Sequence, residues 1–157
     1  MPELKILNSK EIKEILALIE KQWGAKPNLD YGFLQNQKNR VFIISKDISK
    51  IDVSKLKLNS VGMYFCEIHK HGLRLSIEGS QIVGPIATKN AVEISDEEAK
   101  KWFNGEDFKK DCKDCSGFVI LRHNSNFIGN GKYSNGNILN YLPKTRRINT
   151  SMYPNFE

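Results

Sequence analysis

The chain has 157 residues, of which 39% are hydrophobic and 10% aromatic, and it carries a formal net charge of +6. This composition excludes a disordered chain and suffices for one ordinary domain or two small domains that share a core. No apolar run approaches the length of a membrane span, and the first residues lack the apolar core of a signal peptide, so we expect a cytoplasmic protein. The positive charge favours nucleic acid or an acidic surface as the partner.

The first predicted element is an amphipathic helix. Asn8 and Glu11 have the spacing of a capping box, and Gly24 is a suitable stop. Between them apolar residues follow at helical spacing: Ile12, Ile15, Leu16, Ile19 and Trp23. We expect one apolar stripe to pack inward, with Trp23 in the core.

Strand-like runs follow the break at Pro27. They comprise residues 31–34, 40–45, 60–68 and 73–77, and His71-Gly72 is a plausible hairpin turn before the last of them. Residues 46–57 fit either a short helix or a loop. The first half is therefore expected to be a helix followed by a mostly antiparallel sheet.

The residue pattern changes at 79–87, where two glycines and Pro85 surround what we expect to be another short strand. We place a domain boundary near residues 77–79. Ser95 and Glu98 then form a second capping box, with Trp102 on the buried stripe and Gly105 as the stop.

The sheet resumes after a charged loop. Strands are expected at 117–122, 127–133 and 138–142, and Asn135-Gly136 is the strongest hairpin signal in the chain. Gly129 and Gly131 lie inside a strand pattern, which indicates a bulge or a close approach of another group to the backbone.

Cys112 and Cys115 form an isolated C-x-x-C pair, which fits half a zinc site, a redox pair or simply a turn in a charged loop; we prefer the turn. Three cysteines argue against a disulfide framework and fit a reducing compartment. The other candidate ligands have no recognisable zinc spacing: Cys66, His69, His71 and His123. The three histidines are expected to be exposed turn residues.

The last part of the chain has an unusual charge pattern. Between Asp114 and Glu157 there is no Asp or Glu, whereas five cations occur there, interleaved with aromatic residues such as Phe127, Tyr133 and Tyr141: Arg122, Lys132, Lys144, Arg146 and Arg147. A sheet that carries positive charge without nearby carboxylates suits a polyanion, and we expect that polyanion to be RNA.

These residues resemble a known family. Residues 79–108 followed by 117–147 resemble a PUA domain, and the segments GFVILR, FIGNGKY and LPKTRR look most like the PUA-like tails of rRNA cytosine-C5 methyltransferases and like stand-alone archaeal proteins. The first half is similar to the pre-PUA domain of a large-subunit ribosome-biogenesis factor family. The resemblance implies an α+β fold, with a small α/β pre-PUA domain at 1–77, a PUA pseudo-barrel of mixed β-strands with short helices at 78–150, and a tail at 151–157.

The family implies a non-catalytic RNA-binding protein, acting on tRNA or rRNA in RNA modification or ribosome biogenesis, without cofactor, metal or catalytic residues. The RNA-binding residues carried over are Arg122, Asn130, Lys132, Tyr133, Lys144, Arg146 and Arg147. One departure is that the loop at 104–117 contains no Pro, although the family has a Pro-Gly-rich loop there. The alternative function is an adaptor that docks on an RNA-modifying enzyme or a ribosomal protein, and a third is a metal or redox protein using Cys112 and Cys115.

Overall fold

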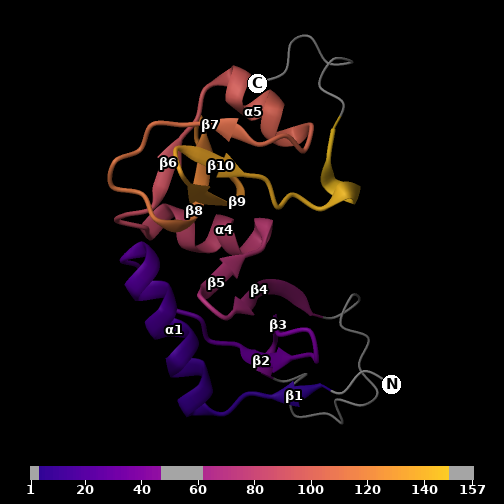
Figure 1. The fold of residues 1–157 in the computed structure, drawn as a ribbon. Coiled ribbons are helices and arrows are strands. Elements are labelled where there is room, and N and C mark those ends of the chain that lie inside the picture. Colours follow the sequence, from indigo (N-terminus) through magenta and orange to yellow (C-terminus); the bar gives the residue numbers. More distant parts are fainter. Residues whose placement is uncertain (1–3, 47–61, 149–157) are drawn as a thin grey trace.

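The computed structural model describes residues 4–46 and 62–148, and in that part the chain has an α+β fold with two five-stranded sheets (Figure 1). The first sheet follows chain order and is antiparallel throughout: β1 (Lys5–Ile6), β2 (Gly32–Gln35), β3 (Arg40–Ile44), β4 (Met63–His69) and β5 (Gly72–Leu75). The undecided segment 46–57 lies almost wholly outside the described residues, as do the start of the run 60–68 and the tail 151–157.

The second sheet has the order β6-β8-β9-β10-β7, and only β6 and β8 are parallel. Its strands are β6 (Ala91–Glu93), β7 (Phe108–Lys109), β8 (Gly117–His123), β9 (Asn126–Ser134) and β10 (Asn137–Leu139). The predicted hairpin at Asn135-Gly136 is confirmed, with both residues at positive φ as a two-residue turn between twisted strands requires. β10 ends at Leu139, three residues earlier than expected.

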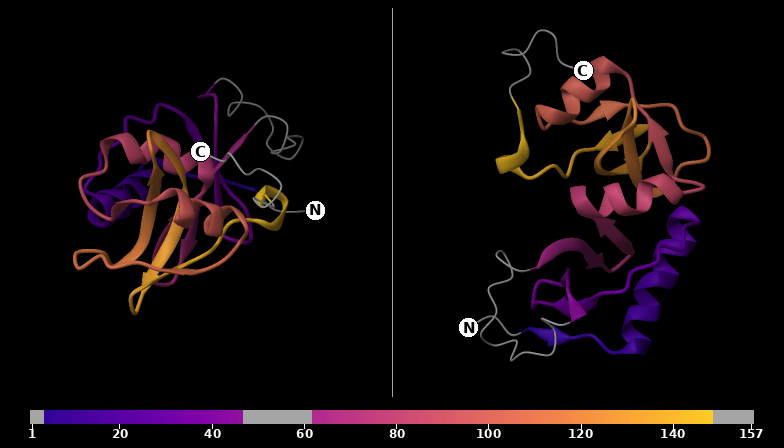
Figure 2. Two further views of the ribbon diagram at one scale, coloured as in Figure 1. Left: turned by 90° about the horizontal axis from the view of Figure 1, so that it is seen from above. Right: turned by 180° about the vertical axis from the view of Figure 1, so that it is seen from behind.

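Helix α1 (Ser9–Trp23) has the predicted capping box at Asn8 and the predicted Gly24 stop, which is left-handed. It lies along the first sheet, and its last turn reaches the second half of the chain (Figure 2). There the Gln22 side-chain amide donates to the carbonyl oxygens of Ser116 and Phe118, each at 2.7 Å, and the Thr88 backbone N–H donates to the carbonyl oxygen of Trp23 at 2.8 Å. These bonds attach the end of α1 to the second half.

The expected short strand within 79–87 is wrong, and so is the extension of the preceding strand to Ile77. β5 ends at Leu75, Ser76 caps helix α4 (Ile77–Val83), and a 3₁₀ helix, η2 (Gly84–Ile86), follows with Pro85 in its first turn. The Ser76 hydroxyl accepts a hydrogen bond from the Gly79 N–H at 2.9 Å. A helix of seven residues is too short to display its periodicity, so only the cap could have indicated it.

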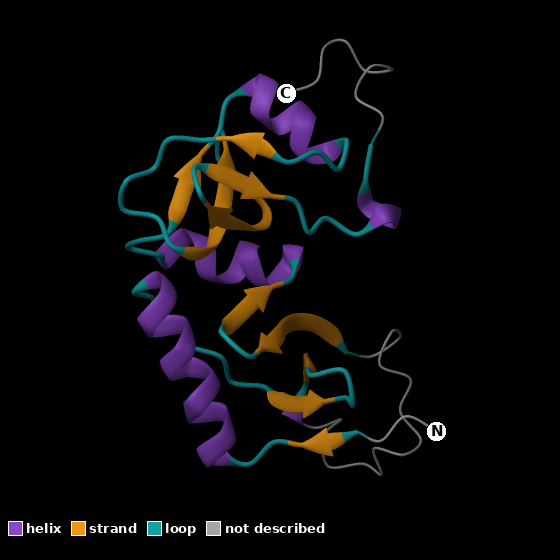
Figure 3. Cartoon of the chain, in the orientation of Figure 1, coloured by secondary structure: helices purple, strands orange, loops and turns teal. Residues whose placement is uncertain are grey.

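Helix α4 lies between the two sheets and packs against both β4 and β9 (Figure 3). Gly79 allows this close approach, because a Cβ at that position would lie 2.3 Å from the carbonyl oxygen of Phe65. That oxygen belongs to a strand backbone, which has little freedom to shift.

The variant Gly79→Ala is therefore expected to lower the free energy of unfolding by about 1–3 kcal/mol, even though Ala favours helices over Gly. Thermal unfolding followed by circular dichroism measures the loss. Gln81→Ala, at an exposed position of the same helix, is the matched control and should leave the melting temperature nearly unchanged. A stabilised Gly79→Ala protein would contradict the packing of α4 on β4.

Helix α5 (Asp96–Phe103) has the predicted capping box between Ser95 and Glu98 and buries Trp102. Close neighbours explain the two strand glycines: a Cβ on Gly129 would lie 2.7 Å from Cζ2 of Trp102, and a Cβ on Gly131 would lie 2.8 Å from Cγ2 of Ile138. The predicted close approach is thus confirmed, and the strand-pair register also shifts nearby, between Leu121 and Arg122.

Strand β8 joins the two hydrophobic clusters of the core. Phe118 and Ile120 pack with α1 and the first sheet, whereas Val119 and Leu121 pack with Trp102 of α5. Both faces of β8 are therefore buried, as its almost continuous apolar sequence requires. Among the described residues, no helix is both long enough and apolar enough to cross a membrane.

Candidate nucleic-acid interface

The structure distributes the seven predicted RNA-binding residues over three places. Arg122 lies near the end of β8, and β9 carries Asn130, Lys132 and Tyr133. The 3₁₀ helix η3 (Lys144–Arg146) contains Lys144 and Arg146, and Arg147 directly follows it. Arg122 is opposite Phe127, whereas Lys132 is opposite Phe118 at the other end of the strand pair. Four residues along a strand span about 13 Å, so Arg122 does not join the other cations.

Arg122 is also partly neutralised. Its Nε lies 3.5 Å from Oε2 of Glu93 on the neighbouring strand β6, and it donates to the Asn124 carbonyl oxygen at 2.9 Å. Glu93 precedes the acid-free part of the sequence, but the parallel pairing of β6 with β8 brings it opposite Arg122. Because Arg122 lies at the opposite end of the β8–β9 pair from Lys132, we place it outside the candidate interface.

Lys132 belongs to a chain of cations and aromatic rings that crosses from one sheet to the other. Its Nζ lies 5.9 Å from the centre of the Phe118 ring, which lies 6.0 Å from the Tyr141 ring. The guanidinium of Arg74, on β5, lies 5.1 Å from the centre of the Tyr141 ring. Tyr141 is 37% exposed, so it is an accessible aromatic residue with one cation over its ring and a second connected to it through Phe118, and an unpaired base can stack on such a ring.

The first sheet extends this arrangement with residues that sequence reasoning missed. Arg40 lies over the Tyr64 ring at 5.8 Å, and both Arg40 and Arg74 approach Glu67, at 3.8 and 2.7 Å. The only signal in the sequence was the alternation in the run Leu73-Arg74-Leu75. It places Arg74 on the face opposite its apolar neighbours but does not show what that face meets.

Glu67 holds the arginines in place. Burial opposes ionisation of its carboxyl group, but the hydrogen bond from Arg74 and the charges of Arg74, His69 and Arg40 outweigh burial and lower its pKa below the ordinary 4.5. A lowered pKa in the folded state means that Glu67 contributes stability above its unfolded pKa, and that this contribution is lost as the pH falls through the folded pKa.

The variant Glu67→Gln is accordingly expected to melt at a lower temperature than the wild type at pH 7. The difference should shrink below about pH 4, where the wild-type carboxyl group also becomes neutral. Melting curves from pH 7 to pH 2.5 measure this. Glu93→Gln, which removes the exposed partner of Arg122, is the control and should show little difference at any pH. If the difference in melting temperature between the wild type and Glu67→Gln were the same at every pH, the charge of Glu67 would not be its cause.

The 3₁₀ helix η3 places the remaining three cations next to α4 and the end of α5. Arg146 donates to Oε1 of Glu78 at 3.1 Å, and Nε of Arg147 donates to the Leu142 carbonyl oxygen at 3.2 Å. Lys144 is exposed and has no carboxylate partner among the described residues. Arg146 lines the same cavity as Tyr141 and Arg74, which connects this end of the chain to the group formed by Lys132, Tyr141 and Arg74.

We define the basic surface as six cations carried by β3, β5, β9 and the segment that follows Tyr141: Arg40, Arg74, Lys132, Lys144, Arg146 and Arg147. Two carboxylates, Glu67 and Glu78, pair with some of them. The segment without acids in the sequence is therefore not free of acids in space, but the six cations outnumber the carboxylates that pair with them among the described residues. The surface contains four of the seven predicted residues.

Asn130 and Tyr133 are not on that surface. Asn130 is only 4% exposed, and its Oδ1 accepts from the Leu75 N–H at 3.2 Å, which joins β9 to β5. Tyr133 is half-buried against the cluster around Trp102, and its hydroxyl accepts from the Cys112 N–H at 3.3 Å.

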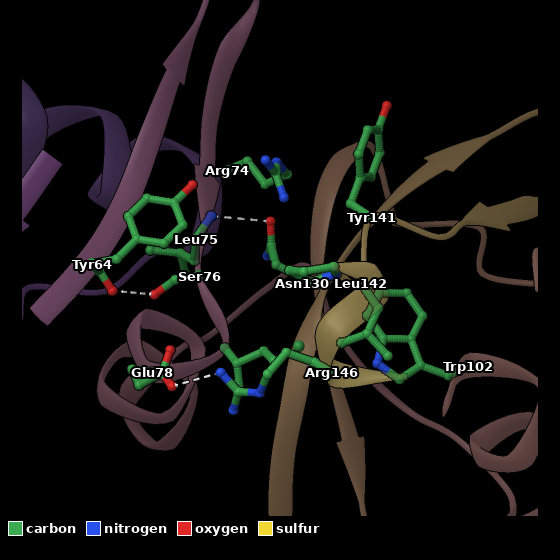
Figure 4. Close-up of a pocket in the computed structure, with 13 residues that line it drawn as sticks. Tyr64, Arg74, Leu75, Ser76, Glu78, Trp102, Asn130, Tyr141, Leu142 and Arg146 are labelled. Carbon is green, nitrogen blue, oxygen red and sulfur yellow. Dashed lines mark hydrogen bonds and ion pairs between the residues drawn. The ribbon is translucent and has the colours of Figure 1, made fainter. Parts of the chain in front are cut away.

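Asn130 instead borders a cavity of about 60 Å³ between the two sheets (Figure 4). Residues of the first sheet and α4 form one side, including Tyr64, Arg74 and Glu78. Asn130, Trp102, Tyr141 and Arg146 come from the second half of the chain. The cavity thus opens within the basic surface, and it brings together Asn130 and Arg146 from the predicted set.

Two expectations for the other polar residues need correction. His123 is buried rather than exposed, with Nε2 2.7 Å from Oδ1 of Asp96 at the start of α5. Cys112 and Cys115 do lie at a turn, but they are linked by a disulfide, so the interpretation as a simple turn was incomplete. His69 and His71 are exposed as expected. Within residues 4–46 and 62–148, no three His, Cys, Asp or Glu side chains are grouped to hold a metal ion.

The two sheets and the short helices make this an α+β protein. Residues 89–148 match the family model described as the methyltransferase RsmF PUA domain. This part includes β6 to β10, α5 and η3. The predicted PUA fold is therefore confirmed.

The similar proteins are bacterial. Over 138 residues, 88% of this chain, the protein is 27% identical to the ribosomal RNA small subunit methyltransferase F of Aeromonas hydrophila. It is 30% identical over 97 residues to the enzyme of the same name from Vibrio campbellii. The chain spans 28% and 20% of the length of these two relatives. The Aeromonas alignment is much longer than segment 89–148, so it includes part of the first half of the chain. The pre-PUA character of that half stays a prediction, and so does the likeness to archaeal proteins.

Proposed function

We propose that this protein binds ribosomal RNA through its PUA domain and the basic surface, and that it acts in rRNA modification without catalysing a reaction itself. The observation that carries the proposal is the position of Tyr141, an exposed ring between Lys132, through Phe118, and Arg74. Cations bind phosphates without regard to sequence, and an exposed ring stacks on an unpaired base.

The similarity to RNA methyltransferases supports the choice of RNA over other polyanions. The family model covers residues 89–148, which carry Lys132, Tyr141 and the three cations in and beside η3, namely Lys144, Arg146 and Arg147. Arg40 and Arg74 come from the first sheet, so we propose that RNA contacts both halves of the chain. tRNA is the second candidate ligand, and the titration described below distinguishes it from rRNA fragments.

The experiment is a fluorescence anisotropy titration of the full chain with labelled fragments of small-subunit rRNA and with tRNA, at salt concentrations from 50 to 300 mM. Four to six phosphate contacts predict that log affinity falls with log salt with a slope of about −3 to −4 for single strands. A slope near zero would contradict the proposal. Tighter binding of tRNA than of every rRNA fragment would replace rRNA with tRNA.

The non-catalytic part of the proposal has a separate test. Incubation of the protein with rRNA and a labelled methyl donor should produce no methylated RNA above background. A co-purification experiment with and without nuclease separates RNA binding from the adaptor alternative, because partners held through RNA are lost on nuclease treatment whereas a directly docked protein is retained.

A further inference from the structure

The cavity beneath the basic surface is lined by polar atoms without partners. Among the described residues, four that line it each have a buried side-chain atom that makes no hydrogen bond: Oη of Tyr64, Nε of Arg74, Nε1 of Trp102 and Nδ2 of Asn130. An unsatisfied buried polar atom costs about 1–3 kcal/mol, and native proteins contain few of them. Four around one cavity indicate that a hydrogen-bonding group occupies it.

The chemistry of these atoms selects the occupant. Arg Nε, Trp Nε1 and Asn Nδ2 can only donate, and the Tyr hydroxyl can donate as well. The orientation of Asn130 follows from its neighbour: the Leu75 N–H needs an acceptor, so Oδ1 must face it and Nδ2 must face away. The occupant must therefore present hydrogen-bond acceptors.

Charge and shape narrow the choice further. Arg74 is paired with Glu67, and Arg146 is paired with Glu78, so the cations at the cavity are already balanced and an anion gains little. Aromatic side chains also border the cavity, which suits a flat group. By the usual measure a water molecule needs about 10–15 Å³, so about 60 Å³ is more than one water requires.

We propose that this cavity accepts the carbonyl-bearing edge of one unpaired RNA base, a uracil or a guanine, turned inward from a strand that lies on the basic surface. The proposal rests on the proposed RNA binding and deepens it. Uracil and guanine present an exocyclic carbonyl oxygen where cytosine and adenine present an amino group, which would face the donors of the cavity. Tyr141, at the mouth, lies where the neighbouring base would stack.

Two matched variants isolate the cavity. Trp102→Phe removes the Nε1 donor of a residue that lines the cavity, while Trp23→Phe removes an equally buried and equally unpartnered Nε1 from a residue that does not line it. Asn130→Asp keeps an acceptor for the Leu75 N–H but replaces the inward donor with an oxygen. Circular dichroism verifies that each variant is folded before binding is measured.

The probes are oligo(U) and oligo(C) of twelve nucleotides, which have equal charge and differ in the exocyclic group. We expect the wild type and Trp23→Phe to bind oligo(U) about tenfold more tightly than oligo(C), and Trp102→Phe and Asn130→Asp to bind the two within about twofold of each other. The chain has two tryptophans, so in the Trp23→Phe variant all tryptophan fluorescence comes from Trp102. That emission should change on adding oligo(U), while the emission of Trp102→Phe should not.

The outcomes separate the two proposals. If the wild type binds both oligonucleotides equally and the cavity variants behave like Trp23→Phe, RNA binding stands, but the cavity holds only water and the base site is overturned. If the wild type binds neither oligonucleotide nor rRNA, the proposed function fails and the base site fails with it. A cavity variant that loses the preference but retains the salt-dependent affinity supports both.

Discussion

Replacing Lys132, Lys144 and Arg147 with Ala in one protein is expected to weaken RNA binding roughly 100-fold at 0.1 M salt and to reduce the salt slope by about 2. These three cations have no carboxylate partner among the described residues, so their removal leaves no uncompensated acid. Each contributes by releasing counterions from one phosphate, which is why the affinity and the slope should fall together. Anisotropy titrations with rRNA fragments measure both quantities.

The matched control removes three exposed lysines from helix α1, Lys10, Lys13 and Lys21, and so changes the net charge of the protein equally. Their removal should reduce affinity only slightly, through the general field, and should leave the slope nearly unchanged. Equal losses from the two triple variants would mean that RNA is attracted by total charge rather than bound at the basic surface.

The largest effect on stability is expected for Trp23→Ala. Trp23 is fully buried at the end of α1, and its carbonyl oxygen accepts from the Thr88 N–H of the second half. Truncating a buried Trp costs about 3–5 kcal/mol, which for a chain of this size corresponds to a fall in melting temperature of roughly 10 °C. Calorimetry should show this fall.

Leu16→Ala, at a half-buried position of the same helix, is the control and should cost less, in proportion to the apolar area that it buries. A Trp23 variant as stable as the Leu16 variant would contradict the role of Trp23 in attaching α1 to the second half. A second, separate transition in the Trp23 variant would show that the two halves had become uncoupled.

Local signals predicted much of this fold. The capping boxes at Asn8 and Ser95 and the Asn135-Gly136 turn are confirmed because each depends only on residues that are neighbours in the sequence. The glycines at 129 and 131 also indicated a close approach, although the sequence could not identify Trp102 and Ile138 as the groups that approach.

Prediction failed where a residue's role depends on distant parts of the chain. Arg122 and Arg146 were expected to lie in an acid-free region, but β6 and α4 bring Glu93 and Glu78 to them. His123 was expected to be exposed because it begins a turn, but the start of α5 covers it. The residues that line the cavity are likewise scattered along the sequence between Tyr64 and Arg146, and no spacing rule connects them.

The position of α4 has a consequence for any attempt to transplant the RNA-binding part of this chain. A fragment cut at residue 89, where the family model begins, would lose α4, the Leu75 partner of Asn130 and the α1 contacts of Phe118. The apolar face of β8 and β9 that these elements cover would then meet solvent. The smallest portable module is therefore longer than the recognisable motif, and a fusion or tether designed with this protein should carry both halves.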